Sequence, residues 1–175
     1  MQLTGKQIVI NNIIQGIGEP EIQIQQQGVD LKLDKVYEFS ELTNAGYICK
    51  NNKENKIPLP NLVNPIKIDG KDMYRLKPGY YEVYFEESCK IPSNVSLHYK
   101  TRSTLIRSGA VIHSGQFDAG FTTDKMGAFL HVIHPNGIII EKGARVCQAI
   151  CFESEDVEKE KLYGNIGGSQ YQNQK

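Results

Sequence analysis

Apolar and polar residues alternate with a period of two in parts of this chain. In VDLKLDKV, residues 29–36, apolar side chains occupy positions 29, 31 and 33, and charged side chains occupy positions 30, 32 and 34. Because successive side chains of a β-strand point to opposite faces of its sheet, this alternation predicts a half-buried strand whose charged residues face solvent. The shorter alternation EIQIQ, residues 21–25, predicts another strand just before it.

From residue 80 onward, short runs rich in β-branched and aromatic residues recur about every ten residues, separated by turn-forming residues. The runs are YYEVYFEE (80–87), IPSNVSLHYK (91–100), SGAVIH (108–113), MGAFLHVIH (126–134), GIIIEKG (137–143) and ARVCQAICFE (144–153). Strands at this spacing are typical of an all-β sandwich, barrel or jelly roll. The predicted fold class is therefore mainly β.

One short amphipathic helix is predicted at the start of the chain. Thr4 followed by Gln7 fits a capping box, in which each residue's side chain bonds the other's backbone amide. Isoleucines at positions 10, 13, 14 and 17 then recur at helical spacing, and the glycines at 16 and 18 end the pattern.

Two segments predict irregular structure. Residues 41–71 are rich in Asn, Lys, Pro and Gly, which indicates a long surface excursion with at most one short strand and no functional residues. The end of the chain, NIGGSQYQNQK (165–175), indicates a mobile tail. We therefore expect a single domain over residues 1–162 and a tail over residues 163–175.

The length and charge of the chain indicate how many domains it has and which kinds of partner it does not attract. A chain of 175 residues fits one domain with a proper core. Its 20 Lys and Arg balance 20 Asp and Glu, and the sequence pI is near 6.9, so no long-range field attracts DNA, RNA or an anionic membrane. No apolar run approaches the roughly 18 residues of a membrane span, and the first residues do not fit a secretion signal. We expect a cytoplasmic protein.

The cysteines and histidines do not predict a metal site. The chain has four cysteines: Cys49, Cys89, Cys147 and Cys151. They form no C-x-x-C pair and have no His at zinc-ligand spacing, so buried free thiols are expected. A disulfide between positions 147 and 151 is not expected, because residues four apart on one strand are roughly 13 Å apart. His131 and His134 would point to opposite faces of a strand.

Four segments carry candidate chemistry. TRSTLIRSG (101–109) combines two arginines with several hydroxyl groups, which suits phosphate oxygens. GVDL (28–31) carries Asp30, KGARVCQ (142–148) opens a strand, and HSGQFDAGF (113–121) holds Asp118 between two bends. Each segment taken singly also fits a structural role: a solvated edge strand, a solvent-facing Asp, a turn before a strand, and a carboxylate that closes a turn.

The order of these segments resembles the ordered motifs of the trimeric dUTPase and dCTP deaminase superfamily. GVDL, RST with a downstream arginine, GQFDAGF, GARVCQ and a glycine-rich tail containing SQYQ follow one another through nearly the whole chain. The opening LTGKQIV, followed by EIQIQQQGVDL, is similar to archaeal-type members. The resemblance implies a distorted jelly-roll-like β-barrel that forms a homotrimer, with active sites between the subunits and a tail that closes over the bound nucleotide.

The resemblance also implies roles for individual residues. Asp30 would contact a hydrated Mg²⁺ through water, and Asp118 would accept a proton from the attacking water. Gly115 matches the glycine that lets the base approach the main chain, and Phe121 stands where most members have a Tyr against the deoxyribose. The remaining implied substrate-binding residues are Arg102, Ser103, Thr104, Arg107, Gln116, Gln148, Gln170 and Tyr171.

The implied activity is Mg²⁺-dependent hydrolysis of dUTP to dUMP and pyrophosphate, and three departures from the family pattern bear on it. Deaminase members carry a Glu on the strand after the third motif, whereas no Glu lies between Phe121 and Glu141 here. His131 is nearest that place, and we expect it to be structural. The segment TTDKM (122–126) is inserted after Phe121, and the tail lacks the arginine of many dUTPases.

These departures leave alternatives to a dUTP pyrophosphatase. An altered third motif and tail fit a nucleotide-binding regulator that keeps the pocket without the reaction. A bifunctional enzyme that also deaminates dCTP is the third hypothesis, against which the missing Glu argues. A β protein with no ligand is the fourth, and the ordered motifs argue against it.

Overall fold

The computed structural model describes residues 1–39 and 44–165, except for the side chain of Asn52. Gln170 and Tyr171, two of the residues assigned to substrate binding, lie outside the described residues. Within the described ranges, no helix is long and apolar enough to cross a membrane.

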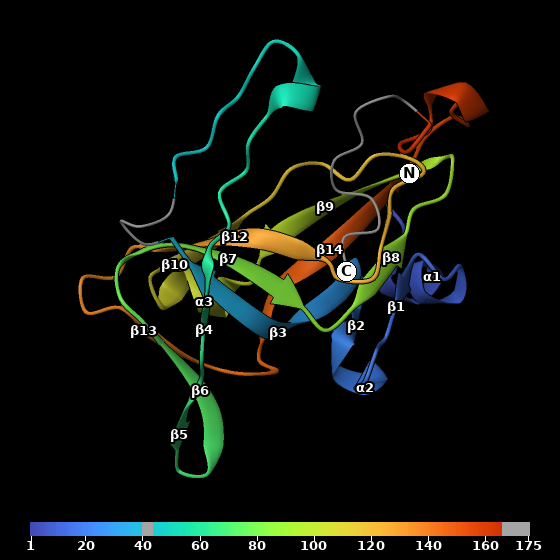
Figure 1. Ribbon diagram of the computed structural model, residues 1–175. Coiled ribbons are helices and arrows are strands. Elements are labelled where there is room, and N and C mark those ends of the chain that lie inside the picture. The colour runs from blue at the N-terminus through green and yellow to red at the C-terminus, as the bar shows by residue number, and fades with distance from the viewer. Residues whose placement is uncertain (40–43, 166–175) are drawn as a thin grey trace.

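One large antiparallel sheet forms the body of the molecule. Its strands are hydrogen-bonded in the order β10 (Ala110–His113), β12 (Gly127–Val132), β7 (Gly79–Phe85), β3 (Gly28–Glu38), β14 (Arg145–Glu153) and β9 (Val95–Thr101) (Figure 1). The two outer strands meet at Thr101, whose hydroxyl accepts a hydrogen bond from the Ile112 amide at 3.0 Å. The sheet is therefore a nearly closed barrel, which confirms the predicted fold class.

Smaller elements surround the barrel. β2 (Ile24–Gln25) and β4 (Asn61–Val63) pair with β3. A second sheet has the order β1 (Ile14–Gln15), β8 (Ser88–Lys90) and β11 (Thr122–Thr123). A third has the order β13 (Ile138–Glu141), β6 (Lys71–Leu76) and β5 (Ile66–Ile68), and its β5–β6 end projects from the body (Figure 1). The helical segments are α1 (Gly5–Ile10), α2 (Pro20–Gln23), α3 (Ser103–Arg107) and the 3-10 turns η1 (Asn52–Glu54) and η2 (Lys159–Lys161).

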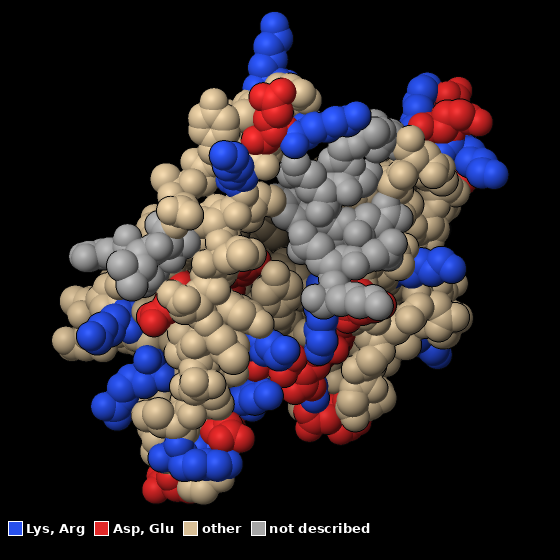
Figure 2. Space-filling view, in the orientation of Figure 1, with Lys and Arg blue, Asp and Glu red and all other residues tan. Residues whose placement is uncertain are grey.

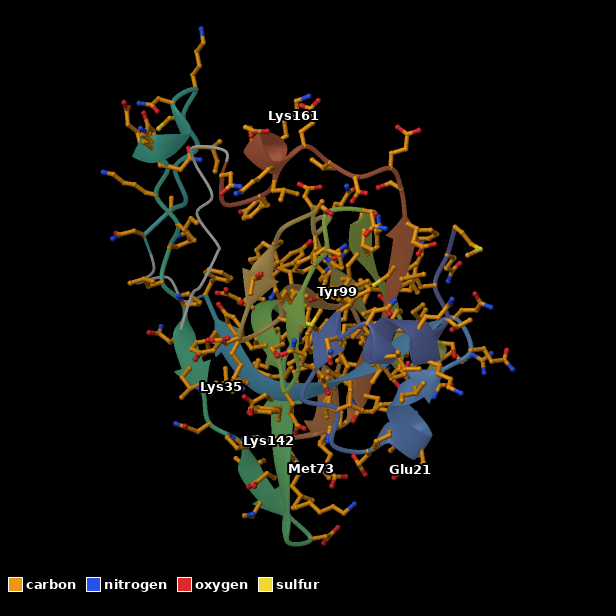
Figure 3. All side chains as sticks on the ribbon, turned by 90° about the vertical axis from the view of Figure 1, so that its right-hand side faces the viewer. Glu21, Lys35, Met73, Tyr99, Lys142 and Lys161 are labelled. Carbon is orange, nitrogen blue, oxygen red and sulfur yellow. The ribbon has the colours of Figure 1, made fainter. Side chains whose placement is uncertain are left out.

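Apolar side chains of the strands fill the barrel. Those with at most 1% exposure include Val29, Leu31, Leu33, Val83, Phe85, Leu97, Leu130 and Ala149. Tyr99 lies among the strands (Figure 3), and its ring meets that of Phe85 edge-on, with 5.5 Å between centroids. Burying one large apolar side chain contributes about 1.5–3 kcal/mol relative to leaving it exposed, so this interior is the main source of stability.

The N-terminal capping box is confirmed, but the helix is shorter than predicted. The Thr4 hydroxyl accepts a hydrogen bond from the Gln7 amide, and the Gln7 side chain accepts one from the Thr4 amide. α1 ends at Ile10, and Asn12 then adopts a positive φ of 53°, which is incompatible with a continuing right-handed helix. Ile14, predicted on the helix, instead pairs with Cys89 as part of β1.

The strand predicted for EIQIQ is largely wrong. Pro20 occupies the first turn of α2, where its missing N–H is not needed, and the Gln23 amide donates to the Glu19 carbonyl at 2.9 Å. Only Ile24 and Gln25 are extended, and they pair with the start of β3.

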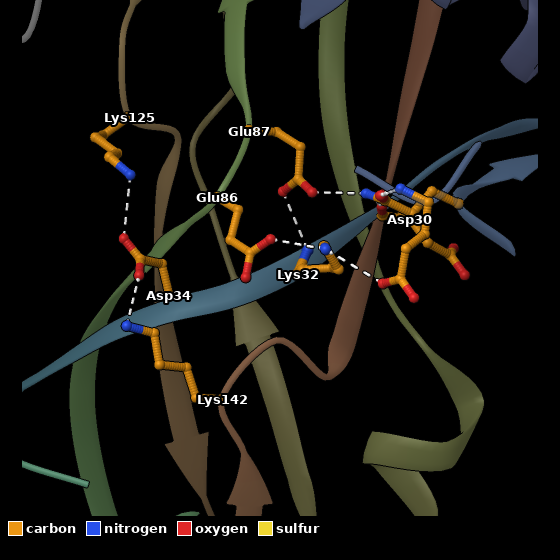
Figure 4. Close-up of polar contacts among 9 residues, drawn as sticks. Asp30, Lys32, Asp34, Glu86, Glu87, Lys125 and Lys142 are labelled. Atoms are coloured by element: carbon orange, nitrogen blue, oxygen red, sulfur yellow. Dashed lines mark hydrogen bonds and ion pairs between the residues drawn. The ribbon is translucent and has the colours of Figure 1, made fainter. Parts of the chain in front are cut away.

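β3 lies where predicted, but its charged face is not solvated. Asp30 and Lys32 are only 2% and 8% exposed. The Lys32 ammonium is paired with Glu86 at 2.8 Å and Glu19 at 3.2 Å (Figure 4). The alternation identifies the polar residues of the strand, but it does not show that side chains from distant segments enclose them.

Three further elements differ from the prediction. The excursion contains two short strands, β4 and β5, where at most one was expected, and β6 follows it unpredicted because KDMYRL shows no clear alternation. The segment after β9 forms the helix α3, with Arg102 as its N-cap, which no pattern predicted and which excludes the alternative of a solvated edge strand. All four cysteines are free, as predicted, but Cys49 is half-buried whereas the other three are buried.

Candidate active site

The first cluster of predicted site residues surrounds Asp30. Its Oδ2 lies 3.0 Å from Arg102 Nε and 3.1 Å from Arg145 Nη1, and its Oδ1 accepts a hydrogen bond from Gln148 Nε2 at 3.2 Å. Arg102 precedes α3, and Arg145 and Gln148 lie on β14, which pairs with β3. One carboxylate therefore joins three segments that are far apart in the sequence.

Burial and charge act in opposite directions on this carboxylate. Burial raises the pKa of Asp30 above its ordinary value, and Arg102, Gln148 and Arg145 oppose that rise by stabilising the charged form. The Arg102 and Arg145 side chains are 28% and 25% exposed, so each guanidinium group is held by Asp30 on one side and reaches solvent on the other. Such pairing fixes the direction of the remaining N–H donors, which are suited to phosphate oxygens.

A second buried carboxylate supports the strand on which Asp30 lies. Glu87 accepts a hydrogen bond from Gln23 Nε2 at 2.6 Å and another from the Lys32 backbone amide at 3.1 Å (Figure 4). The same Gln23 amide group donates to the Asp30 carbonyl at 3.0 Å. Glu87 and Gln23 therefore satisfy backbone groups of β3 and link α2 to the strand beside Asp30.

The predicted phosphate-binding hydroxyls lie on α3. Ser103, Thr104 and Arg107 are exposed there, and Leu105 anchors the helix in the interior. The Arg102 Nη1 group donates to the Arg145 carbonyl at 3.1 Å, which holds the start of α3 against β14. The exposed face of α3 therefore adjoins the Asp30 cluster through Arg102.

The second group of predicted residues lines a pocket of about 490 Å³. Gly115, Gln116, Asp118 and Phe121 come from the loop between β10 and β11. The pocket is also lined by residues of β7, β12, the inserted segment and the C-terminal segment: Glu82, Tyr84, Phe129, Lys125 and Tyr163. The Asp30 cluster contributes none of the lining residues. The predicted site residues within the described chain thus form two separate groups.

Asp118 is exposed in this pocket on a loop that is held on both sides. Its Oδ1 accepts a hydrogen bond from Gln116 Nε2 at 2.9 Å. The Phe117 and Leu97 backbones exchange two hydrogen bonds of 3.0 Å, and the Ile91 amide donates to the Phe121 carbonyl at 2.8 Å. These bonds attach the loop to β9 and to the segment before it, so the carboxylate is presented from a fixed backbone.

Aromatic packing connects the loop to the barrel interior. The Tyr99 ring contacts Phe117 at 4.9 Å between centroids, Phe117 contacts Phe121 at 5.3 Å, and Phe121 contacts Tyr163 at 5.1 Å. Aromatic pairs in such edge-on or tilted arrangements contribute about 0.5–1.5 kcal/mol each beyond their buried area. The continuous chain of rings therefore fixes Phe121, at 7% exposure, in the pocket wall.

The inserted segment TTDKM contributes Thr123 and Lys125 to the lining of the pocket. Thr122 and Thr123 form β11, and Lys125 lines the pocket while its ammonium pairs with Asp34 at 3.1 Å. Lys142 pairs with the other oxygen of Asp34 at 3.2 Å (Figure 4). Burial raises the pKa of Asp34, but the two lysines outweigh it and hold this pKa below its ordinary value.

The histidines near the missing deaminase Glu have packing contacts. The His131 ring stacks on Tyr80 at 4.1 Å between centroids and an interplanar angle of 16°. It does not line the pocket, whereas His113 does. The pocket instead contains a second carboxylate, Glu82 on β7, which is paired across the strands with Phe129 of β12.

The described residues include no group of three or more His, Cys, Asp or Glu that could surround a metal ion. At Asp30, Oδ2 already accepts from two arginines and Oδ1 from Gln148. A carboxylate has about four acceptor positions, so one remains on Oδ1. That position fits contact with a metal-bound water and does not fit direct enclosure of a metal by the protein.

The sequence patterns did not single out several residues of these two groups. Arg145 lies within the recognised GARVCQ segment, three residues before Gln148. Its charge so close to a predicted substrate-binding residue was a signal that could have identified it as part of the site. Glu82 and Tyr84 lie on a strand that was predicted, and Tyr84 donates to Glu82 Oε1 at 2.7 Å. Tyr163 gave no signal, because only the fold brings it to Phe121.

The fold and the two groups of residues define the class of protein. It is a nearly closed β-barrel in which Asp30 orients two arginines, and a separate pocket lined by aromatic residues presents Asp118. A family model described as dCTP deaminase-like matches residues 3–154. That match spans most of the chain, which belongs to this family.

Individual relatives agree with the family. The chain is 31% identical over 162 residues to a probable deoxyuridine 5′-triphosphate nucleotidohydrolase of Methanosarcina mazei, covering 93% of this chain and 88% of the relative. It is 33% identical over 138 residues to the deoxyuridine 5′-triphosphate nucleotidohydrolase of Methanocaldococcus jannaschii, covering 79% of this chain and 83% of the relative.

A solved structure shares the fold. The 2′-deoxycytidine 5′-triphosphate deaminase of Agrobacterium tumefaciens superposes with a TM-score of 0.56 at 16% identity, over 91% of this chain. This chain spans 50% of the length of that deaminase. At this identity the likeness concerns the barrel alone.

Proposed function

We propose that this protein is a dUTP nucleotidohydrolase that converts dUTP to dUMP and pyrophosphate. The observation that carries the proposal is the exposed Asp118 carboxylate, held on a fixed loop in an aromatic-lined pocket of about 490 Å³. Relatives with 31% and 33% identity are named for this reaction, which supports the choice of substrate.

In this proposal Asp118 is the general base. Gln116 occupies its Oδ1, which leaves Oδ2 to accept a proton from a water molecule directed at the α-phosphorus. The oxygen of that water forms the new bond to phosphorus, the bond to the bridging oxygen breaks, and pyrophosphate leaves. Phe121 lies beside the sugar, and the backbone at Gly115 and Gln116 contacts the uracil edge.

The triphosphate is assigned to the Asp30 cluster and α3. Arg102 has N–H donors beyond the two used for Asp30 and the Arg145 carbonyl, and it is 28% exposed. Ser103, Thr104 and Arg107 add exposed donors from α3, and Gln148 adds an amide. Gln170 and Tyr171, which lie outside the described residues, are assigned to the tail that is proposed to cover the nucleotide.

Mg²⁺ is the proposed cofactor, and Asp30 would contact it through a bound water with the remaining acceptor position of Oδ1. Bound there, the cation would neutralise charge on the phosphate oxygens. Arg102 and Arg145 stabilise the ionised form of Asp30 against the effect of burial, and their ion pairs fix the orientation of its carboxylate.

We further propose that the active enzyme is a homotrimer in which the Asp118 pocket of one subunit faces the Asp30 cluster of another. The support is that no residue of the Asp30 cluster lines the pocket within one chain, although the proposed reaction uses both groups. A cytoplasmic location is proposed as well. The four free cysteines support it, because oxidising compartments favour disulfides.

The test of the proposed function is pyrophosphate release by the purified protein with Mg²⁺, offered dUTP, dCTP, dTTP and UTP in parallel. We expect release from dUTP at a rate well above that from the other three. Binding of dUTP without release from any nucleotide would favour the regulator over the enzyme.

A bifunctional enzyme is the second candidate, and one observation favours it. Glu82 places a carboxylate in the pocket from the strand beside β12, on which deaminase members carry their Glu. Ammonia release from dCTP in the same assay, lost in Glu82→Gln, would support this candidate. If no ammonia is released from dCTP, the bifunctional candidate fails and the dUTP pyrophosphatase remains.

A further inference from the structure

The pocket that contains Asp118 is lined by one aromatic residue from the C-terminal segment that belongs to none of the recognised motifs. Tyr163, from the segment after β14, lines the pocket together with Asp118 and Phe121. Its ring meets the Phe121 ring with centroids 5.1 Å apart and an interplanar angle of 69°, so the two rings form a corner. Phe121 is 7% exposed while Tyr163 is half-buried, so Tyr163 adds accessible aromatic surface to this side of the pocket.

The position of Tyr163 is fixed by the backbone of the Asp118 loop. The Tyr163 amide donates to the Ala119 carbonyl at 2.8 Å. Gly120 has a φ of +87°, and a Cβ at that position would lie 2.9 Å from Leu162 Cβ and 3.1 Å from the Tyr163 amide nitrogen. Only a glycine allows the segment to approach this closely without strain. The contact is therefore specific to the local sequence of the loop.

The segment is also held before it reaches the pocket. The Val157 amide donates to the Ser93 carbonyl at 2.9 Å, and the Ser93 hydroxyl donates to Asp156 at 2.7 Å. Tyr163 thus follows a segment with its own attachments to the barrel, with η2 between them. A residue whose backbone is bonded to the Asp118 loop and whose ring packs against Phe121 is a suitable surface for packing against a ligand.

We propose that Tyr163 is a specificity-determining residue that packs against the sugar of the bound nucleotide and crowds its 2′ position. The inference rests on the proposed function, which places the deoxyribose beside Phe121. A 2′-hydroxyl pressed against the faces of the two rings would lose its hydrogen bonds to water, and a ring face offers no equal replacement, which is costly. Tyr163 and Phe121 together then favour a deoxynucleotide over a ribonucleotide.

The first test compares substrate selectivity among variants. Tyr163→Ala should lower the ratio of kcat/KM for dUTP to kcat/KM for UTP by about 10-fold or more, because the ring that excludes the hydroxyl is gone. Tyr163→Phe keeps the ring, so its ratio should stay within about 3-fold of wild type. Tyr47→Ala is the matched control, because Tyr47 is 59% exposed and does not line the pocket.

The second test does not depend on turnover. The chain has no tryptophan, so Tyr163→Trp creates a single fluorescent reporter in the pocket wall. Addition of a non-hydrolysable α,β-imido analogue of dUTP with Mg²⁺ should quench or shift its emission in a saturable manner. Tyr47→Trp, the control, should show no saturable change.

The outcomes separate the inference from the proposed function. Hydrolysis of dUTP by wild type, with unchanged selectivity in Tyr163→Ala, would overturn the role of Tyr163 and leave the enzyme intact. So would an emission that does not respond to an analogue whose binding is confirmed by calorimetry. If wild type does not hydrolyse dUTP, the proposed function fails, and the tryptophan titration still decides whether Tyr163 contacts a bound nucleotide.

Discussion

At the scale of single residues, Asp30 is the centre on which the arginine cluster depends. Its removal in Asp30→Ala leaves two guanidinium groups without their buried partner. Loss of one partner of a buried pair costs about 3–5 kcal/mol, and because both arginines are about a quarter exposed we expect roughly 2–4 kcal/mol in the free energy of unfolding.

Urea unfolding of the variant measures this loss. Glu158→Ala is the control, because its ion pair with Lys161 joins side chains that are each 69% exposed and should contribute less than about 1 kcal/mol. Equal effects of the two substitutions would contradict the structural role of Asp30.

Glu87 predicts a pH dependence of stability. It is fully buried and accepts hydrogen bonds from two neutral groups, and burial raises its pKa from 4.5 to about 7. The folded protein therefore binds a proton more tightly than the unfolded chain between these values. The contribution of Glu87 to the free energy of unfolding is fully present below pH 4.5 and is lost as the pH rises through 7. The total loss is about 3 kcal/mol.

Unfolding free energies measured in urea from pH 5 to pH 8 test this prediction. Glu87→Gln, which cannot ionise, should flatten the decline over that range. The exposed Glu21→Gln serves as the control and should leave the decline unchanged. A wild-type protein whose stability rises between pH 5 and pH 7 would contradict the assignment.

At the scale of elements, the contact between the Asp118 loop and the C-terminal segment depends on Gly120. Gly120→Ala should destabilise by about 1–3 kcal/mol, because its φ of +87° disfavours a side chain and the new Cβ would meet Leu162. Detachment of the segment should also speed trypsin cleavage after Lys159 and Lys161, because their side chains are already exposed and cleavage then depends on how mobile the backbone is.

Cleavage rates under native conditions provide the measurement. Gly115→Ala is the matched control, since no heavy atom lies within 4 Å of an added Cβ there and its φ is not positive. Its stability and cleavage rate should equal those of wild type. If both variants are cleaved alike, the segment is not held through Gly120.

The elements also show what the sequence could predict. The capping box of Thr4 and Gln7 and the strand β3 were predicted from local patterns, and both elements are present. The end of α1 depends on the backbone of Asn12, and the burial of Asp30 depends on arginines more than 70 positions away, which no local pattern reveals. The division of the site into two groups likewise arises only when β9, β14 and the Asp118 loop assemble.

At the scale of the whole molecule, the positive and negative charges balance. On the face shown in Figure 2, Lys and Arg are interspersed with Asp and Glu, in keeping with a formal net charge of zero. Anion binding must therefore come from local clusters such as the one around Asp30, and not from a long-range field.

The proposed trimer makes a prediction about mixtures. Asp118→Asn and Arg102→Ala should each be inactive, because each lacks one of the two groups. After subunit exchange in an equal mixture, sites that take Asp118 from one variant and Arg102 from the other should recover about a quarter of wild-type activity. No recovery, with exchange demonstrated by mass spectrometry, would contradict a site shared between subunits.

The central claim is that Asp118 activates the water that hydrolyses dUTP, and steady-state pyrophosphate release from dUTP by wild type and Asp118→Asn tests it most directly. Asparagine keeps the size of the side chain and removes its basicity, so the account predicts a fall in kcat of about 10²–10⁴-fold. Calorimetric binding of the α,β-imido analogue of dUTP should be largely preserved. A variant that turns over dUTP at the wild-type rate would show that Asp118 only closes a turn.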